Sequence, residues 1–88
     1  MGNPPVTIYT TPSCGYCKIA KQHFKANNIQ FTEVNVDGHF KKIEEMVELS
    51  GQLGVPVIKI GETVQVGWDR KKFETAYEAL TLEHGRGA

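Results

Sequence analysis

The sequence predicts a small α/β domain with the element order β-α-β-α-β-β-α, a four-stranded mixed sheet flanked by three helices. Three observations predict this class. The chain has 88 residues, enough for one core but not for a second domain. Short β-rich runs alternate with segments whose apolar residues recur at helical spacing. The last two β-rich runs are separated by only two residues, the length of a tight hairpin loop.

The first half of the chain predicts a strand, a helix and a second strand. Val6 to Thr10 is β-rich. Phe31 to Val36 is the second β-rich run, with one face formed by Thr32, Val34 and Val36 and the other by Glu33 and Asn35. Between them lies an amphipathic segment that we expect to end near Asn27-Asn28. Its apolar positions are Cys17, Ala20 and Phe24. Two strands joined by a helix in this way run parallel with a right-handed connection.

Asp37-Gly38 ends the second strand, and a second helix follows that ends at Gly51. We expect its periodic positions to pack on the core; they are Phe40, Ile43, Met46, Val47 and Ser50.

A hairpin and a third helix complete the domain. Val57 to Ile60 and Thr63 to Val66 are expected to pair antiparallel through a Gly61-Glu62 turn of type II′ or I′. Asp69 is a suitable N-cap for the last helix. The apolar stripe of that helix is Phe73, Tyr77 and Leu80. We expect the domain core to span about residues 6–82 and residues 83–88 to form a flexible tail.

The composition indicates which classes of binding partner and which location to expect. Ten Lys and Arg balance ten Asp and Glu, so the charge favours neither nucleic acid nor a membrane surface. The N-terminus resembles no signal peptide, and no apolar run approaches membrane-spanning length. We therefore expect a cytoplasmic protein. Nothing in the sequence requires more than a monomer, and we expect no tightly bound cofactor or metal.

The chemistry centres on Cys14 and Cys17, which lie between the first strand and the first helix. Residues three apart on a helix share a face, so a small adjustment brings two such thiols to disulfide distance. Cys14 would lie at the helix N-terminus, where the backbone N–H groups and the dipole favour a thiolate. Cys14 is therefore the candidate nucleophile.

Three other interpretations of the cysteines stay open. A zinc site would need further ligands from His23, His39 and His84, none of which forms a pair at usual ligand spacing. A structural disulfide closing so short a loop would remove little chain entropy. The chain could also be a binding module with incidental cysteines. A reducing compartment favours a redox-active pair.

The chain resembles the glutaredoxins from about Val6 to Leu80. The resemblance rests on Cys14-Gly15-Tyr16-Cys17, Val55-Pro56 and Gly67-Trp68-Asp69 at their relative positions. It implies a thioredoxin-like fold with a cis bond before Pro56, which lets the Val55 backbone pair with a substrate chain beside Cys14. It also implies a glutathione groove formed by Tyr16, Val55, Pro56, Gly67, Trp68 and Asp69.

The resemblance further implies thiol–disulfide exchange, in which Cys14 attacks a target disulfide and Cys17 displaces the product. Lys18, one turn after Cys14, is a candidate to support the thiolate. Gly15 replaces a proline common in the family. By the same resemblance, glycine there occurs in glutaredoxins that bind an iron–sulfur cluster between two subunits with glutathione, so a cluster carrier is the alternative function.

Three positions differ from many glutathione-using relatives: Thr11 replaces a lysine, Gly54 a threonine and Val66 a glycine. The electron donor is therefore expected to be glutathione or thioredoxin reductase, and the targets disulfide-containing proteins. Val66 to Arg70 partly matches redoxins that serve ribonucleotide reductase.

Arg70 and Lys71 occupy a helix turn whose dipole disfavours cations, which suggests contact with a carboxylate of glutathione or of a partner.

Overall fold

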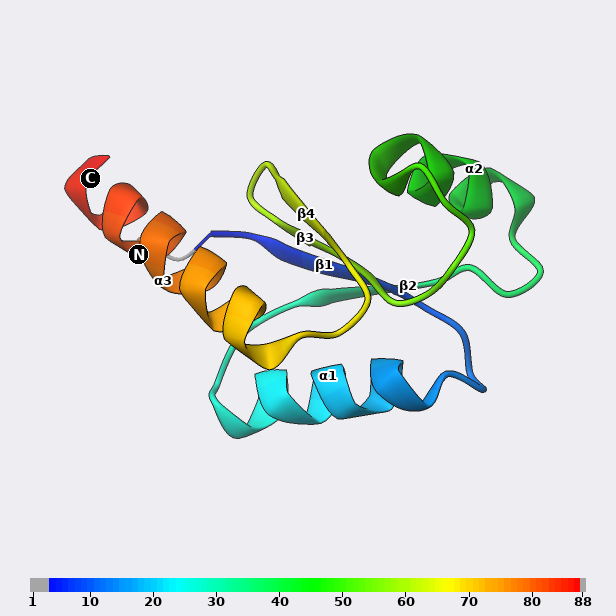
Figure 1. Ribbon diagram of the computed structural model, residues 1–88, viewed down its shortest axis with the longest axis horizontal. Coiled ribbons are helices and arrows are strands. Elements are labelled where there is room, and N and C mark those ends of the chain that lie inside the picture. The colour runs from blue at the N-terminus through cyan, green and yellow to red at the C-terminus, as the bar shows by residue number, and fades with distance from the viewer. Residues whose placement is uncertain (1–3, 88) are drawn as a thin grey trace.

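A four-stranded mixed sheet forms the centre of the structure, with helices on both of its faces (Figure 1). The structure is a computed structural model that describes residues 4–87, with side chains described for residues 4–81. In chain order, the elements are β1 (Val6–Thr10), α1 (Gly15–Ala26), β2 (Thr32–Asn35), α2 (Phe40–Ser50), β3 (Val57–Ile60), β4 (Thr63–Val66) and α3 (Arg70–Gly87). This is the predicted order.

The strand order is β2-β1-β3-β4, with β1 and β2 parallel and the other two pairs antiparallel. Tyr9 lies opposite Val34 on one side and Val57 on the other. Val57 in turn lies opposite Val66. This register places the C-terminal ends of β1, β2 and β4 and the N-terminal end of β3 at one end of the sheet.

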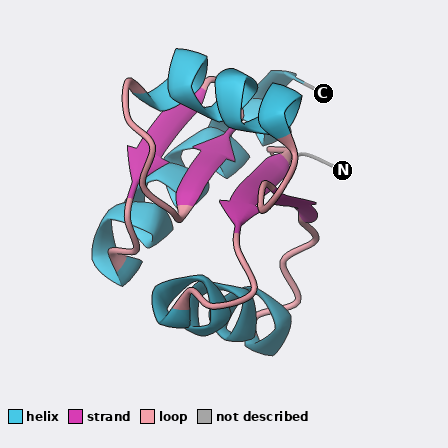
Figure 2. Cartoon of the chain, turned by 90° about the vertical axis from the view of Figure 1, so that its right-hand side faces the viewer, coloured by secondary structure: helices cyan, strands magenta, loops and turns pink. Residues whose placement is uncertain are grey.

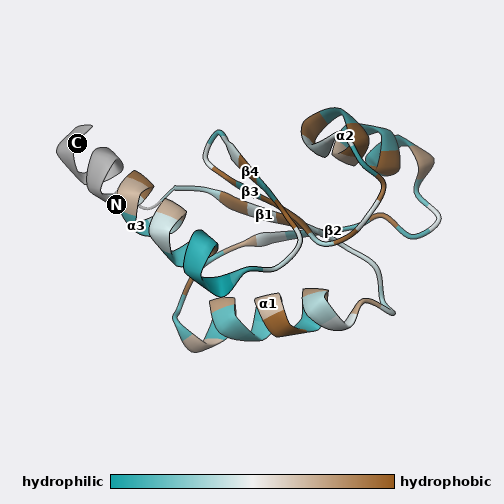
Figure 3. Ribbon diagram, in the orientation of Figure 1, coloured by the Kyte–Doolittle hydropathy of each residue, from teal (hydrophilic) through white to brown (hydrophobic). Residues whose placement is uncertain are grey.

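Helices α1 and α3 cover one face of the sheet, and α2 covers the other (Figures 1 and 2). The α1/α3 side buries Val6, Ile8, Ala20, Phe24, Ile58, Ile60 and Phe73. The α2 side buries Tyr9, Val36, Met46 and Val57. In β1, Val6 and Ile8 belong to the α1/α3 side and Tyr9 to the α2 side, because strand side chains alternate between faces. Hydrophobic residues accordingly colour β1 and β3 at the centre of the sheet (Figure 3).

Most helix ends and the hairpin turn lie at the capping and turn residues that the sequence predicted. Asn27 caps α1 and Gly51 ends α2 in the left-handed conformation. The Asp69 carboxylate accepts the backbone N–H of Lys72 at 3.1 Å and so caps α3. In the hairpin only Gly61 has a positive φ, 58°, which is the pattern of a type II′ turn.

The second strand is shorter than predicted, because β2 covers Thr32–Asn35 and leaves Phe31 and Val36 outside. Among the strands of residues 4–87 it is an edge strand that pairs with β1. Val36 still donates its N–H to the Thr10 carbonyl at 2.9 Å and is buried, so the expected apolar face holds beyond the strand end.

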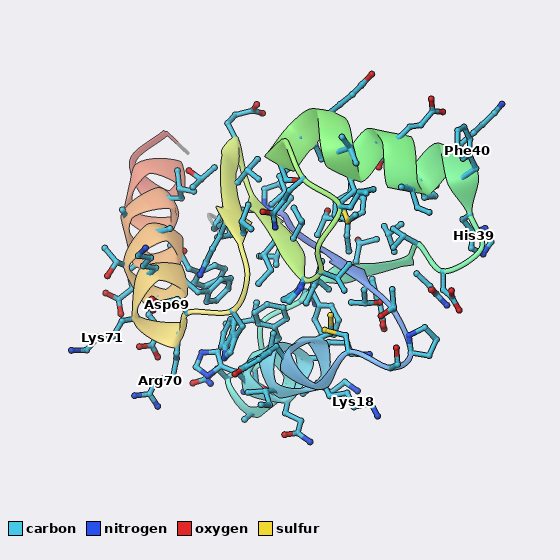
Figure 4. All side chains as sticks on the ribbon, turned by 45° about the vertical axis from the view of Figure 1, so that its right-hand side comes forward. Lys18, His39, Phe40, Asp69, Arg70 and Lys71 are labelled. Carbon is cyan, nitrogen blue, oxygen red and sulfur yellow. The ribbon has the colours of Figure 1, made fainter. Side chains whose placement is uncertain are left out.

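Phe40 does not belong to the core, contrary to the prediction from periodicity. Its side chain is 72% exposed, and Figure 4 shows it at the outer end of α2. Phe40 is the first residue of the helix and precedes the turns that contact the sheet, so it shares the apolar stripe without reaching the core. Met46 is the residue of α2 that is fully buried.

The last helix continues beyond its predicted end. Its backbone is helical through residues 83–87, which the sequence assigned to a flexible tail after the helix. No proline interrupts this stretch, and each residue added to an existing helix gains a hydrogen bond. The predicted tail also includes Ala88, which lies outside the described residues. None of the helices within residues 4–87 has both the length and the hydrophobicity to cross a membrane.

Candidate active site

Three segments that are distant in sequence meet at one end of the sheet. The loop after β1 carries Cys14, the segment before β3 carries Val55-Pro56, and the loop after β4 carries Gly67 to Asp69. The Gly67 N–H donates to the Pro56 carbonyl at 2.8 Å and links two of these segments directly. The sheet register therefore brings the three predicted motifs together.

Cys14 occupies the N-cap of α1. Its backbone is extended, with φ −82° and ψ 112°, and its Sγ accepts the backbone N–H of Cys17 at 3.1 Å. The side chain is half-exposed. The Sγ of Cys14 therefore lies at the N-terminal end of α1, with a backbone N–H directed at it.

Cys17 lies in the first turn of α1 and is fully buried. The pKa of its thiol is raised to about 12, mainly by burial and also by the side-chain hydrogen bond with Cys14, while the Thr11 backbone and the positive charge of Lys21 act in the opposite direction. Both cysteines are free thiols in the structure. Cys17 is thus a neutral thiol near neutral pH, while Cys14 is the sulfur that an incoming disulfide can reach.

The Val55–Pro56 peptide bond is cis, as the resemblance implied. Pro56 is buried and Val55 is half-buried beside it. Gly67 has a φ of 81°, a conformation that favours glycine. Cis X-Pro bonds typically occur in tight turns, and this one lies in the turn that leads into β3.

The two aromatic residues of the predicted groove lie in different surroundings. Tyr16 is 65% exposed next to Cys14. The Trp68 ring is half-buried and packs against His23, Phe24 and Phe73, with ring centroids 5.4, 5.8 and 5.7 Å away. The side chain of Trp68 therefore helps anchor α1 to α3, and its backbone follows Gly67 at the active end.

Three exposed cations lie near the N-terminal ends of α1 and α3, the helices that begin at this end of the sheet. Lys18 extends from α1, and Arg70 and Lys71 extend from the first turn of α3 into solvent (Figure 4). That turn is strongly hydrophilic in Figure 3. None of the three forms an ion pair with another side chain in the described part of the chain. They are available to an anionic partner.

The histidines considered for a metal site are dispersed. His23 lies on α1, 3.7 Å from the Glu74 carboxylate, whereas His39 precedes α2 on the opposite face of the sheet. The side chain of His84 lies outside the described residues. Among the described side chains, no three His, Cys, Asp or Glu residues are grouped so that they could hold a metal ion.

One polar cluster near Cys17 was missed from the sequence. Glu33 Oε2 accepts the Thr10 hydroxyl at 2.9 Å and the Lys21 ammonium at 2.7 Å. The Lys21 hydrogen bond is the main cause that lowers the pKa of Glu33; burial opposes it, and Thr10 assists. The available signal was that Lys21 follows Cys17 by one helical turn.

The chain is similar to known proteins in both sequence and fold. The glutaredoxin family model matches residues 6–65. A glutaredoxin-like 8.6 kDa protein in the rubredoxin operon of Clostridium pasteurianum is 42% identical over 73 residues, which are 83% of this chain and 97% of that protein. A Pseudomonas aeruginosa glutaredoxin is 42% identical over 66 residues, 75% of this chain and 79% of the relative. The crystal structure of an Archaeoglobus fulgidus glutaredoxin has a TM-score of 0.75 at 25% identity and covers 82% of this chain and 84% of its own. The chain therefore belongs to the glutaredoxin family of thiol–disulfide oxidoreductases.

Proposed function

We propose that this protein reduces disulfides by dithiol exchange, with Cys14 as the attacking thiol and Cys17 as the resolving thiol. One observation carries the proposal. Cys14 is half-exposed and its Sγ accepts a backbone N–H at the start of α1, while the neighbouring Cys17 is fully buried. The two thiols are thereby suited to successive steps.

In the first step, the Cys14 thiolate attacks a target disulfide, forms a mixed disulfide and releases one target thiolate. In the second, Cys17 loses its proton to solvent and attacks Cys14 Sγ. The bond between Cys14 and the target breaks, the second target thiolate leaves and takes up a proton, and two electrons have passed to the target. A donor then reduces the Cys14–Cys17 disulfide.

Single cysteine replacements test this assignment. With a disulfide-bonded peptide as substrate, Cys14→Ser should abolish reduction, and Cys17→Ser should accumulate a mixed disulfide visible by mass spectrometry. Ser13→Ala, at the exposed position before Cys14, is the matched control and should retain activity. Normal turnover by the Cys14→Ser protein would refute the proposal.

The proposed electron donor is glutathione or thioredoxin reductase. Glutathione is supported by exposed Tyr16 and by the placement of Val55 and Gly67 at the end of the sheet that carries Cys14. The oxidised protein would be mixed with reduced glutathione or with NADPH and thioredoxin reductase, with Trp68 fluorescence and thiol counting as readouts. Reduction only by the reductase would exclude glutathione as the donor.

Arg70 and Lys71 are proposed to contact a carboxylate of glutathione or an acidic patch on the reductase. Both are exposed and unpaired among the described side chains. Exposed ion pairs contribute about 0.5 kcal/mol each, so the double variant Arg70→Ala with Lys71→Ala should weaken the apparent affinity for the donor roughly fivefold. Lys25→Ala, which removes an exposed charge from the last turn of α1, is the control. Equal affinities of all three proteins would end this idea.

The proposed setting is the cytoplasm, where a Cys-X-X-Cys pair is kept reduced and used catalytically. The proposed targets are disulfide-containing proteins, with ribonucleotide reductase as one candidate, and the proposed state is a monomer. Pull-down with the Cys17→Ser protein would identify targets as mixed disulfides, with the Cys14→Ser protein as the background control.

A second candidate function is iron–sulfur cluster transfer, with Cys14 and glutathione as the ligands between two subunits. It rests on Gly15, at which a Cβ would meet nothing within 4 Å, so the loop leaves open space beside Cys14. Anaerobic reconstitution with iron, sulfide and glutathione should then give visible absorbance that Cys14→Ser abolishes. A protein that stays colourless would exclude this function.

A further inference from the structure

Lys21 is held in a fixed place beside the buried thiol. It follows Cys17 by four residues in α1, so the two side chains share a helix face. Its ammonium donates to Glu33 Oε2 at 2.7 Å, and the same oxygen accepts the hydroxyl of buried Thr10 at 2.9 Å. The Lys21 side chain is only 24% exposed, so water screens its charge less than that of a free surface lysine.

Cys17 has a chemical need that this charge meets. It must become a thiolate before it can attack Cys14 Sγ, yet its burial strongly favours the neutral thiol. The groups that act on Cys17 are Cys14 and Lys21 from α1 and the Thr11 backbone after β1. Lys21 supplies the positive charge, and Glu33 on β2 holds it.

We propose that Lys21 promotes the resolving step by stabilising the developing thiolate of Cys17, and that Glu33 and Thr10 hold its ammonium in position. This inference rests on the dithiol function proposed above. Lys21 acts through Cys17 and does not contact the substrate. The proton of Cys17 goes to solvent, the new bond forms between the two cysteine sulfurs, and the target thiolate leaves.

The two steps can be followed separately with the chromogenic disulfide DTNB. Attack by Cys14 releases one coloured thiolate at a rate that rises with DTNB concentration. Attack by Cys17 on the resulting mixed disulfide releases a second in a phase independent of that concentration. Stopped-flow absorbance of the full-length reduced protein gives both rate constants.

Lys21→Gln should slow the second phase on the order of threefold to tenfold and leave the first phase unchanged. The variant should reach the wild-type second-phase rate only at a higher pH. Lys21→Arg, which keeps the charge and can still bind Glu33, should restore the rate. Lys25→Gln removes a positive charge one turn further along α1 and should leave both phases unchanged.

Glu33→Gln separates the charge of Lys21 from the ion pair itself. It keeps the ammonium and an oxygen acceptor, so the second phase should stay within about twofold of wild type. Equal slowing by Glu33→Gln and Lys21→Gln would overturn the inference, because Glu33→Gln keeps the Lys21 charge and an acceptor to hold it, so that charge would not account for the rate of the second phase. An unchanged second phase in Lys21→Gln would overturn the role of Lys21 and leave the dithiol function standing. A wild-type protein that releases only one thiolate would overturn both.

Discussion

The two faces of the sheet are packed very differently. Under α1 and α3, Phe24 and Phe73 are fully buried with ring centroids 4.8 Å apart, and Trp68 packs against both. Under α2, Met46 is the buried residue of the helix, and a hydrogen bond from Tyr9 to Glu45 at 2.5 Å adds a polar link. Helix α1, which carries Cys17 and begins at Cys14, is therefore packed against the sheet through several aromatic rings. Helix α2 packs through one fully buried side chain.

Phe24→Ala should have the largest effect on stability, because it removes the centre of the aromatic packing under α1. Loss of a buried phenylalanine costs about 3–5 kcal/mol. Urea unfolding followed by circular dichroism measures this cost. Phe40→Ala is the matched control, since that side chain is 72% exposed and its loss should change stability by less than about 0.5 kcal/mol. Equal losses would contradict the difference in burial.

Met46→Ala should cost less, about 2–3 kcal/mol, near the low end for a buried methionine. Its neighbours from α2 are only half-buried, so the site can relax around the change. Amide hydrogen exchange should accelerate in α2 while α1 stays protected. Equal acceleration in both helices would show that the two faces unfold as one unit.

Tyr9→Phe should cost about 1 kcal/mol near neutral pH, because it removes the hydroxyl bonded to Glu45. Burial, followed by the Glu45 bond and charge, raises the pKa of Tyr9 from 10.0 to about 12. The stabilisation by neutral Tyr9 is therefore complete below pH 10 and is lost as the pH rises toward 12.

Over that alkaline range the wild type should lose roughly 2–3 kcal/mol relative to Tyr9→Phe, so the order of the two stabilities should reverse. Cys17 is present in both proteins, so its titration cancels in the comparison. Urea unfolding at a series of alkaline pH values measures the difference. A constant difference between the two proteins would contradict the raised pKa.

Glu33→Gln should have the smallest effect, about 0.2–1 kcal/mol, because its ion pair with Lys21 is partly screened by water. Since the pKa of Glu33 is lowered, the stabilisation is present above its ordinary value of 4.5 and is lost as the pH falls through the folded value. The stabilities of the two proteins should converge in acid. A difference in stability that grows in acid would contradict the lowered pKa of Glu33.

Signals confined to a few neighbouring residues predicted most of the fold. The Cys17 and Phe24 spacing predicted the buried side of α1, and the Gly61-Glu62 pair predicted the hairpin. Periodicity failed at Phe40 because it identifies the face of a helix but not which turns extend past the sheet. It also failed at residues 83–87, where helix continued without an apolar repeat to indicate it.

The reactive end of the molecule was predicted only in part. The cysteines and the Val55-Pro56 pair carry recognisable local patterns, and their convergence follows from the strand order. The cluster around Glu33 joins residues 23 and 12 positions away in the sequence, and no local pattern specifies such contacts. Side-chain partners across elements depend on register and helix docking, which a single sequence does not specify.

The unequal exposure of the two thiols makes the folded protein a substrate for single-site labelling. A bulky maleimide dye should couple once per native chain, at Cys14, because Cys17 is fully buried. The second coupling requires the chain to open around α1. The ratio of doubly to singly labelled protein over time would therefore record how often this helix leaves the sheet, without denaturant and without a change to the sequence.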